Sequence, residues 1–206
     1  MSGLFITLEG GDGSGKSTQA ELLSDWLSAA GHTVVRTREP GGTELGIELR
    51  NIVLHRRGEI APRAEALLYA ADRAQHIATK VRPAVERGDI VIQDRYFDSS
   101  VAYQGAGRAL GADDVRNISL WATEALMPDL TILLDLDESI GRDRLTGSRT
   151  KYDRLEAEER DFHARARAAY LELAAAEPER FLVLSATDSV ESIAAVVRER
   201  VERLLD

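Results

Sequence analysis

Short apolar runs recur along the chain, and longer segments with a helical spacing of apolar residues lie between them. The runs are rich in β-branched and aliphatic residues and do not alternate strictly, which is typical of strands buried on both faces. They are Leu4–Leu8, Thr33–Val35, Ile90–Ile92, Leu130–Leu136 and Phe181–Leu184. Strands that alternate with helices predict an α/β fold, with a parallel sheet and helices on both of its faces.

Two apolar stripes predict helices in more detail. The first ends just before Gly31, a residue type that favours helix C-termini, and consists of Leu22, Leu23, Trp26, Leu27 and Ala30. The second consists of Val190, Ile193, Ala194, Val197, Val201 and Leu204. The run Ala164–Glu177 predicts a further helix, which Pro178 breaks. Trp26 and Trp121 fall on helical stripes and are expected in the core.

The composition bounds the possible functions. Of the 206 residues, 44% are hydrophobic and 30% are charged, which fits one soluble globular domain. The chain has no cysteine, so disulfides and thiolate metal sites are excluded. Neither a signal peptide nor a membrane-spanning stretch is evident, so we expect a cytoplasmic protein that does not bind membranes. A net charge of −9 argues against nucleic acid as a partner, and a polyphosphate ligand would need local positive charge.

The stretch EGGDGSGKST over residues 9–18 carries the first chemical signal. Gly10, Gly15, Lys16 and Ser17 fit the spacing G-x-x-x-x-G-K-[ST], directly after a predicted strand and at the start of a predicted helix. Backbone N–H groups at a helix start attract anions, Lys16 can reach the β- and γ-phosphates, and the Ser17 hydroxyl can bind Mg²⁺. A chance match is the alternative. The sequence context favours a nucleoside triphosphate site over Gly10, Gly11, Asp12, Gly13, Ser14, Gly15, Lys16, Ser17 and Thr18.

Three further segments narrow the choice among P-loop proteins. They read REPGGT at Arg38–Thr43, YAADR at Tyr69–Arg73 and DRYFDSSVAYQ at Asp94–Gln104. The first can be simply a turn-containing loop. Asp94 and Arg95 follow a predicted strand, at the edge where open α/β sheets bind ligands. Arg95 can hold a phosphate and Asp94 can hold Mg²⁺ directly or through water, or the two can form a structural ion pair.

No guanine-reading N-K-x-D stretch is present, which leaves a small kinase as the favoured class. Nearly end to end, the chain resembles the thymidylate kinase family. The resemblance rests on FITLEGGDGSGKST, TREPGGT, ADR, DRYFDSSVAYQG and DRLE. It implies a P-loop fold of the nucleoside monophosphate kinase kind, with a five-stranded parallel sheet and a lid at about residues 141–156 of a single domain, 1–206. It also implies Mg²⁺-dependent transfer of a phosphoryl group from ATP to dTMP for dTTP synthesis, by a homodimer.

The resemblance implies roles for residues of the base pocket. Tyr69 matches an aromatic residue that stacks on thymine, although core packing is an equal alternative for a tyrosine on an apolar helix face. Arg73 matches the residue that hydrogen-bonds the base carbonyl, and Ser100 and Gln104 match contacts to the base edge. Tyr103 matches a residue near the sugar, where its bulk would disfavour a ribose 2′-hydroxyl.

The resemblance also assigns the charged residues that handle the phosphates. Arg95, with help from Arg50, would grip the monophosphate, and Asp12 would reach the acceptor's 3′-hydroxyl and the magnesium environment. Some family members place an arginine in the phosphate loop, and others supply it from the lid. Gly13 follows Asp12 here, so the chain is expected to be of the second kind.

The segment Gly141–Arg160, dense in charge and poor in apolar residues, predicts a mobile excursion on the same domain, and the implied lid lies within it. Its candidate cations are Arg142, Arg144, Arg149, Lys151 and Arg154. We favour Arg149 and Arg154, with Glu156 ordering the lid or touching the nucleotide. The catalytic set expected is then Lys16, Asp12, Arg95, Arg149 and Arg154.

Two other functional readings remain open at this point. The chain could be a kinase for another acceptor, such as dUMP or a deoxynucleoside, or an ATP-binding protein without catalysis. The four histidines have no ligand spacing, and surface or helix-capping roles are expected for His32, His55, His76 and His163.

Overall fold

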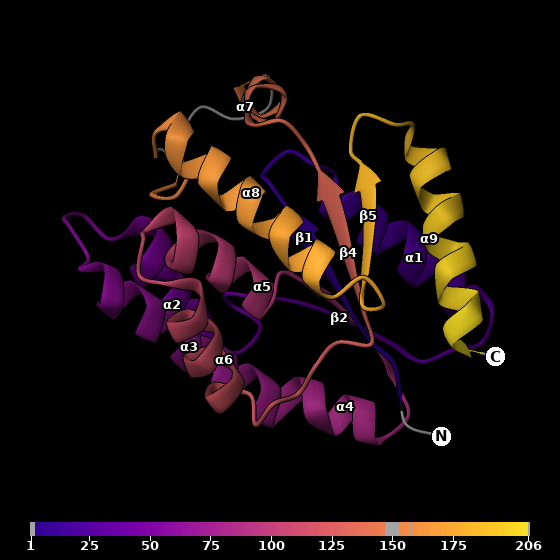
Figure 1. Ribbon diagram of the computed structural model, residues 1–206. Coiled ribbons are helices and arrows are strands. Elements are labelled where there is room, and N and C mark those ends of the chain that lie inside the picture. Colours follow the sequence, from indigo (N-terminus) through magenta and orange to yellow (C-terminus); the bar gives the residue numbers. More distant parts are fainter. Residues whose placement is uncertain (1–2, 147–152, 157, 206) are drawn as a thin grey trace.

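The central element of the fold is a parallel sheet. The computed structural model describes residues 3–146, 153–156 and 158–205. Within these ranges, five parallel strands form one sheet in the order β2–β3–β1–β4–β5 (Figure 1). They are β1 (Phe5–Gly10), β2 (Val34–Arg38), β3 (Ile90–Asp94), β4 (Leu130–Asp135) and β5 (Phe181–Ser185). Each strand coincides with a predicted apolar run to within a few residues, so the predicted parallel sheet is confirmed.

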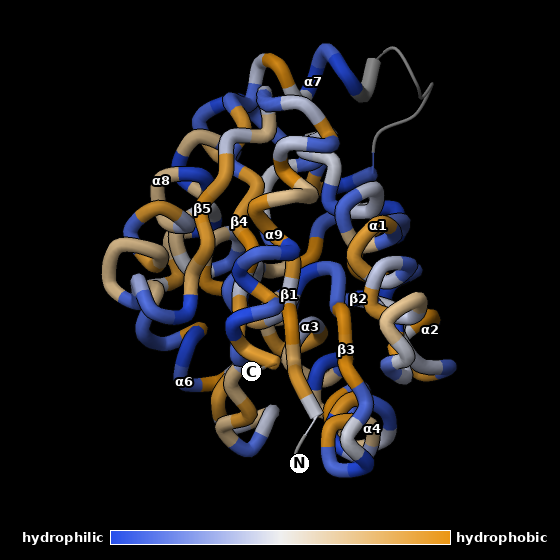
Figure 2. Tube along the Cα trace, turned by 90° about the vertical axis from the view of Figure 1, so that its right-hand side faces the viewer, coloured by the Kyte–Doolittle hydropathy of each residue, from blue (hydrophilic) through white to orange (hydrophobic). Residues whose placement is uncertain are grey.

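Helices cover both faces of the sheet, as the unbroken apolar runs predict. One face carries α1 (Lys16–Ala29) and α9 (Val190–Leu205), and the other carries α4 (Arg82–Glu86), α5 (Phe97–Ser100) and α8 (Arg160–Ala176). Alternate side chains of β1 pack against the helices on the two faces of the sheet. Ile6 and Leu8 pack with Leu23 and Val197 on the α1–α9 face, whereas Phe5 packs in a separate cluster on the opposite face. Figure 2 shows β1 and β3 as largely hydrophobic strands, whereas the helices around them are of mixed hydropathy.

A group of helices extends this second layer beside the sheet. It consists of α2 (Glu44–His55), α3 (Pro62–His76) and α6 (Ala112–Ala122), of which α3 packs against both others. A π-helical turn over Ile77–Val81 joins α3 to α4. Pro83 lacks an N–H and its ring would crowd the preceding turn of an α-helix, which accounts for the wider turn at this point. A second π-helical segment, Val101–Gly107, continues α5 and carries two residues of the predicted base pocket.

Two sequence-based expectations about buried residues are wrong. The Trp121 side chain is 84% exposed, because α6 turns Val115 and Ser119 inward and Trp121 lies on another side of the helix. Trp26 packs against the core but is only partly buried. His76 is fully buried rather than on the surface, since polar groups of the loop after β2 surround it.

The charged segment predicted as the lid begins with a helix, α7 (Glu138–Thr146), which lies at the same end of the molecule as the phosphate loop (Figure 1). In the described part of the chain, no helix is both long enough and apolar enough to cross a membrane.

Candidate active site at the carboxyl edge of the sheet

The predicted phosphate loop joins β1 to α1 at the carboxyl edge of the sheet. Gly15 occupies the N-cap position of α1, and Lys16 is the first residue of the helix. The Lys16 ammonium donates hydrogen bonds to the carbonyls of Gly10 (3.0 Å) and Gly11 (2.8 Å) and is 7% exposed. Burial and the positive charge of Arg95 lower the pKa of Lys16. An amine folded across a helix N-terminus in this way is suited to holding an anion.

Helix α7 packs directly on the backbone of the phosphate loop. Gly13 has φ +77°, and a Cβ at this position would lie 2.9 Å from the carbonyl oxygen of Gly141. A Cβ at Gly141 would in turn lie 2.7 Å from the carbonyl oxygen of Asp12. Arg144 of α7 donates to the carbonyls of Gly13 (3.2 Å) and Ala186 (3.1 Å). The close contact leaves no room for an arginine side chain at position 13.

An ion pair connects the phosphate loop to the strand beside it. The Arg95 Nη2 nitrogen lies 2.6 Å from Oδ1 of Asp12. Although burial raises the pKa of Asp12, the charges of Arg95 and Lys16 and the hydrogen bond from Arg95 outweigh it and lower the pKa to about 2. Within the described residues, Arg95 thus pairs with Asp12 and not with Asp94, the alternative that the sequence left open.

The backbone of Arg95 adopts a left-handed conformation, φ 66°, that is unusual for a residue with a side chain. Its N–H donates to the carbonyl of Leu8 (3.0 Å), and its carbonyl accepts from the Gln93 side chain (3.0 Å). The guanidinium carbon lies 5.3 Å from the centre of the Tyr103 ring. The main-chain contacts fix the conformation, which aims the guanidinium over the loop.

A buried carboxylate, Glu9, lies behind this ion pair. Glu9 is 0% exposed and accepts hydrogen bonds from the Tyr96 amide (2.7 Å), the Ser99 hydroxyl (2.6 Å) and the Tyr170 hydroxyl (2.8 Å). The Ser99 and Tyr170 hydroxyls also accept from Arg95 Nη1, at 3.2 and 3.4 Å. The network therefore holds Nη1 of the guanidinium, whereas Asp12 binds Nη2.

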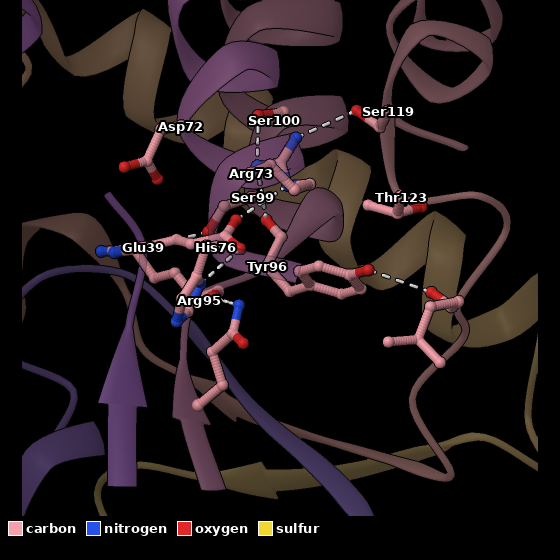
Figure 3. Close-up of polar contacts among 12 residues, drawn as sticks. Glu39, Asp72, Arg73, His76, Arg95, Tyr96, Ser99, Ser100, Ser119 and Thr123 are labelled. Carbon is pink, nitrogen blue, oxygen red and sulfur yellow. Dashed lines mark hydrogen bonds and ion pairs between the residues drawn. The ribbon is translucent and has the colours of Figure 1, made fainter. Parts of the chain in front are cut away.

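Arg73 forms a second charged centre, in the part of the site formed by α3. Its side chain is 2% exposed and forms an ion pair with Glu39 at 2.8 Å. It also donates to the hydroxyls of Ser119 (3.1 Å) and Ser100 (3.0 Å). Figure 3 shows Arg73 between these serines, with Glu39 and His76 on its other side.

One cavity of about 460 Å³ connects both centres to the phosphate loop. Its lining includes Lys16 and Ser17 as well as all the residues predicted to bind the acceptor: Arg50, Tyr69, Arg73, Arg95, Ser100, Tyr103 and Gln104. Residues more than fifty positions apart in the sequence thus face one space, whose size suits a small-molecule ligand.

The residues predicted for the lid differ in whether the structure describes them and whether they line the cavity. Arg149 and Lys151 lie outside the described residues. Arg154 does not line the cavity. Its Nε donates to the carbonyl of Val53 at 2.8 Å, and its guanidinium forms an ion pair with buried Glu65. Glu156 does line the cavity, beside the phosphate loop.

The groups predicted to hold Mg²⁺ fit that ion chemically. Oδ1 of Asp94 is buried and has no hydrogen-bond partner among the described residues, and Ser17 is exposed on the first turn of α1. Both residues line the cavity. No group of three His, Cys, Asp or Glu within the described ranges could hold a metal. One carboxylate and one hydroxyl beside a phosphate loop suit Mg²⁺, which is bound through few carboxylates and mainly by phosphates and water.

Sequence reasoning missed four residues of the site. Glu9, Glu39, His76 and Tyr170 hold the charged groups, and the sequence assigned none of them a role, although Glu9 and Glu39 lie within the quoted stretches EGGDGSGKST and REPGGT. The available signals were weak: Glu9 is a charge at the end of an apolar strand, and His76 follows Arg73 by three positions, on the same face of α3.

A phosphate loop that faces a second polar pocket across the same sheet edge is the arrangement of P-loop kinases that act on nucleotides. A family model described as thymidylate kinase matches residues 8–197. The chain belongs to the thymidylate kinase family, so the predicted family and its P-loop kinase fold are confirmed.

Individual relatives agree with this assignment. A thymidylate kinase from Leifsonia xyli subsp. xyli is 72% identical over 200 residues, covering 97% of this chain and 95% of the relative. One from Bifidobacterium longum (strain DJO10A) is 52% identical, covering 99% of this chain and 100% of the relative. A crystal structure of thymidylate kinase from Ehrlichia chaffeensis is similar with a TM-score of 0.80 at 29% identity, covering 98% of this chain and 99% of that one.

The buried Glu9 predicts a specific pH dependence of stability. Burial, with a contribution from Asp98, raises the pKa of Glu9 from 4.5 to about 7. As the pH rises from about 5 to 8, the unfolded chain releases this proton first, so deprotonation favours unfolding and the free energy of unfolding falls. The Glu9→Gln variant keeps the acceptor for the Tyr96 amide but has no proton to release. We expect it to remove this fall in the free energy of unfolding, which amounts to at most about 3 kcal/mol, at about 1.4 kcal/mol per pKa unit.

Urea unfolding of both proteins across this pH range measures the difference. Glu191→Gln, on the exposed surface of α9, is the control and should follow the wild type. A Glu9→Gln curve parallel to that of the wild type would contradict a proton on Glu9.

Proposed function

We propose that this chain transfers the γ-phosphoryl group of ATP to dTMP, giving ADP and dTDP for dTTP synthesis. Membership of the thymidylate kinase family supports the reaction. The observation that carries the residue-level account is the single cavity shared by the phosphate loop and the pocket around Arg73. In-line transfer requires donor and acceptor phosphates to meet in one space from which water is excluded.

The donor half of the cavity is the phosphate loop. The loop amides and Lys16 bind the β- and γ-phosphates of ATP, and their contacts precede any chemistry, so they position the transferring group at low reorganisation cost. Ser17 and Asp94 would hold Mg²⁺, with the free Oδ1 of Asp94 as the supporting observation. Held there, the ion would supply positive charge that offsets the negative charge of the phosphate oxygens.

The acceptor half depends on Arg95 and Asp12. Arg95, held from behind by the Glu9 network, binds the dTMP phosphate together with Arg50, which lines the same cavity. Asp12 accepts a hydrogen bond from the 3′-hydroxyl of the acceptor sugar. Both groups already lie within contact of each other at the boundary between donor and acceptor, where they orient the attacking oxygen. A general base is not required, because a phosphate monoester is largely ionised at neutral pH.

The base pocket is formed by α3 and the π-helical segment. Tyr69 stacks on thymine, Tyr103 lies against the sugar, and Arg73 donates to a base carbonyl. Gln104 completes the base edge. Its amide nitrogen donates to buried Glu65 at 2.9 Å, so its carbonyl oxygen is the group left to accept from the base N–H.

The lid supplies positive charge to the migrating phosphoryl group. Gly13 excludes an arginine within the phosphate loop, and this supports an arginine from the segment at about residues 141–156. We assign this role to Arg149 and Arg154. For Arg154 it requires release from the ion pair with Glu65, so lid closure would exchange that contact for the phosphate.

The chain is proposed to act as a single cytoplasmic domain that forms a homodimer. Large apolar side chains are exposed on α2, α3 and α6, the group of helices beside the sheet. They are Leu45, Ile47, Ile52, Leu67, Ile118 and Trp121. Large apolar side chains exposed on one group of helices are typical of a protein–protein interface.

Turnover with alternative acceptors tests the function. Purified protein with ATP and Mg²⁺ should release ADP fastest with dTMP, more slowly with dUMP and the ribose form of TMP, and scarcely with AMP or thymidine. The thymine pocket and the bulk of Tyr103 account for the order. A preference for dUMP or thymidine would make it another kinase. ATP binding without turnover would favour the non-catalytic alternative.

The lid assignment predicts a kinetic signature for Arg149→Ala. An arginine that contacts the phosphoryl group mainly in the transition state affects kcat by about 10²- to 10³-fold, with both KM values within about threefold. Steady-state kinetics measure both. The control is Arg160→Ala, an exposed arginine just beyond the lid that pairs with Glu138. An unchanged kcat would remove Arg149 from the mechanism and transfer the role to Arg142 or Arg154.

The dimer proposal predicts the mass in solution. Sedimentation of the wild type should give twice the chain mass of 22.6 kDa. Trp121→Glu should give mainly the single-chain mass, because a carboxylate would be buried in the interface. Val196→Glu, at an exposed apolar position on α9, should remain a dimer. A wild-type protein that sediments as a single chain would contradict the proposal.

A further inference from the structure

Arg73 is held by four groups of the described chain, and only one of them is charged. Its Nε donates to Glu39 (2.8 Å), Nη1 to Ser119 (3.1 Å), and Nη2 to the Tyr96 carbonyl (3.3 Å) and Ser100 (3.0 Å). A guanidinium has five N–H donors, so one donor on Nη1 is left for a ligand. The orientation of this donor is set by Glu39, the counter-charge of Arg73.

The Glu39 carboxylate is itself held by His76. His76 is 0% exposed, and its Nδ1 lies 2.9 Å from the Glu39 oxygen that does not bind Arg73. Its Nε2 lies 2.7 Å from the Thr37 hydroxyl. A neutral imidazole has one donor and one acceptor, which fits donation from Nδ1 to Glu39 and acceptance from Thr37. The chain Thr37–His76–Glu39–Arg73 therefore runs from the end of β2 to the base pocket. Figure 3 shows its last three members, His76, Glu39 and Arg73.

The imidazole has little freedom to move. A Cβ at Gly42 would lie 2.4 Å from its Nε2, so only glycine allows the loop after β2 to pass this close. The same loop is held by Asp72, whose Oδ1 accepts from the Gly41 amide at 3.1 Å. Burial and the negative charge of Glu39 raise the pKa of Asp72 to about 6. Helix α3 thus holds the loop through Asp72 and His76 and also carries Arg73, the arginine proposed to recognise the base.

The loop also reaches the residues proposed to grip the monophosphate. Arg50 donates to the carbonyl of Pro40, the residue after Glu39, at 2.8 Å. Base recognition through Arg73 and phosphate recognition through Arg50 are therefore anchored on neighbouring residues of one loop.

Given the proposed function, we infer that Glu39 and His76 are positioning residues for the acceptor base. His76 fixes the Glu39 carboxylate, and Glu39 fixes Arg73 so that a single N–H donor faces the base edge. Since the other donors are occupied, Arg73 cannot rotate to accommodate a base that presents an amino group instead of a carbonyl. Such a base would set donor against donor, so the arrangement selects dTMP over dCMP.

Two isosteric changes at one position test the inference. In His76→Asn the amide nitrogen lies near the position of Nδ1 and can still donate to Glu39. In His76→Gln it lies near the position of Nε2, and the contact with Glu39 is lost. We expect His76→Gln to raise the KM for dTMP about tenfold, the effect of one weakened buried hydrogen bond, and to lower the preference in kcat/KM for dTMP over dCMP. His76→Asn should stay within about threefold of the wild type, and the KM for ATP should hardly change in either.

A control and a second variant make the result decisive. Thr79→Ala removes an exposed hydroxyl that contacts only the Gln75 carbonyl in the described structure and should match the wild type. Glu39→Asp keeps the charge beside Arg73 but shortens the side chain, so it should also raise the KM for dTMP and not that for ATP. It decides the case if His76→Gln does not fold, as judged by thermal unfolding.

The outcomes separate this inference from the proposed function. Equal KM values for dTMP in His76→Gln and His76→Asn, or a parallel rise in the KM for ATP, would overturn the positioning role. Unchanged kinetics in folded Glu39→Asp would overturn it as well. A wild-type protein that does not phosphorylate dTMP in the same assay would instead contradict the proposed function.

Discussion

The site depends on one charged contact, the ion pair between Asp12 and Arg95. Asp12 belongs to the phosphate loop after β1, and Arg95 follows β3, the neighbouring strand in the sheet. Either charge without the other would be left partly buried and unpaired, which is costly in a low-dielectric cavity. The Glu9 network holds the guanidinium from behind, and the left-handed backbone at Arg95 fixes where it points. The donor and acceptor halves of the cavity are thereby held at one distance by the sheet itself.

The pocket around Arg73 repeats this design with different residues. Arg73 is buried against the carboxylate of Glu39, just as Arg95 is held against Asp12, and in each case neutral donors and acceptors complete the shell. Both arginines are thus oriented before any ligand arrives, so binding would not have to order them. In contrast, α7 rests on the phosphate loop through close backbone contacts of Gly13 and Gly141. In the proposed function, these rigid recognition groups would be complemented by the lid, which would bring charge to the phosphates.

The sequence predicts most of the fold and only part of the site, for physical reasons. Strands such as Ile90–Asp94 are visible because burial on both faces demands unbroken apolar runs, and the phosphate loop is visible because its glycines and Lys16 must be adjacent in sequence. His76 was expected at the surface, since its partners Glu39 and Thr37 lie 37 and 39 positions away and leave no local pattern. Trp121 was expected in the core because it falls on a helical apolar stripe. An apolar residue on a helix can also face outward, and the stripe alone does not distinguish the two cases. Arg149 remains a prediction from resemblance, as it lies outside the described residues.

The central claim is that donor and acceptor occupy one continuous cavity across the Asp12–Arg95 pair. Calorimetric titration with a molecule that joins adenosine to thymidine through five phosphates tests it most directly. The account predicts one molecule bound per chain, with a Kd at least about tenfold below those of ATP and dTMP, because linking the two ligands makes the second contact intramolecular. It also predicts that either substrate alone competes with the linked molecule. Binding no tighter than that of ATP, with no competition by dTMP, would contradict a shared cavity.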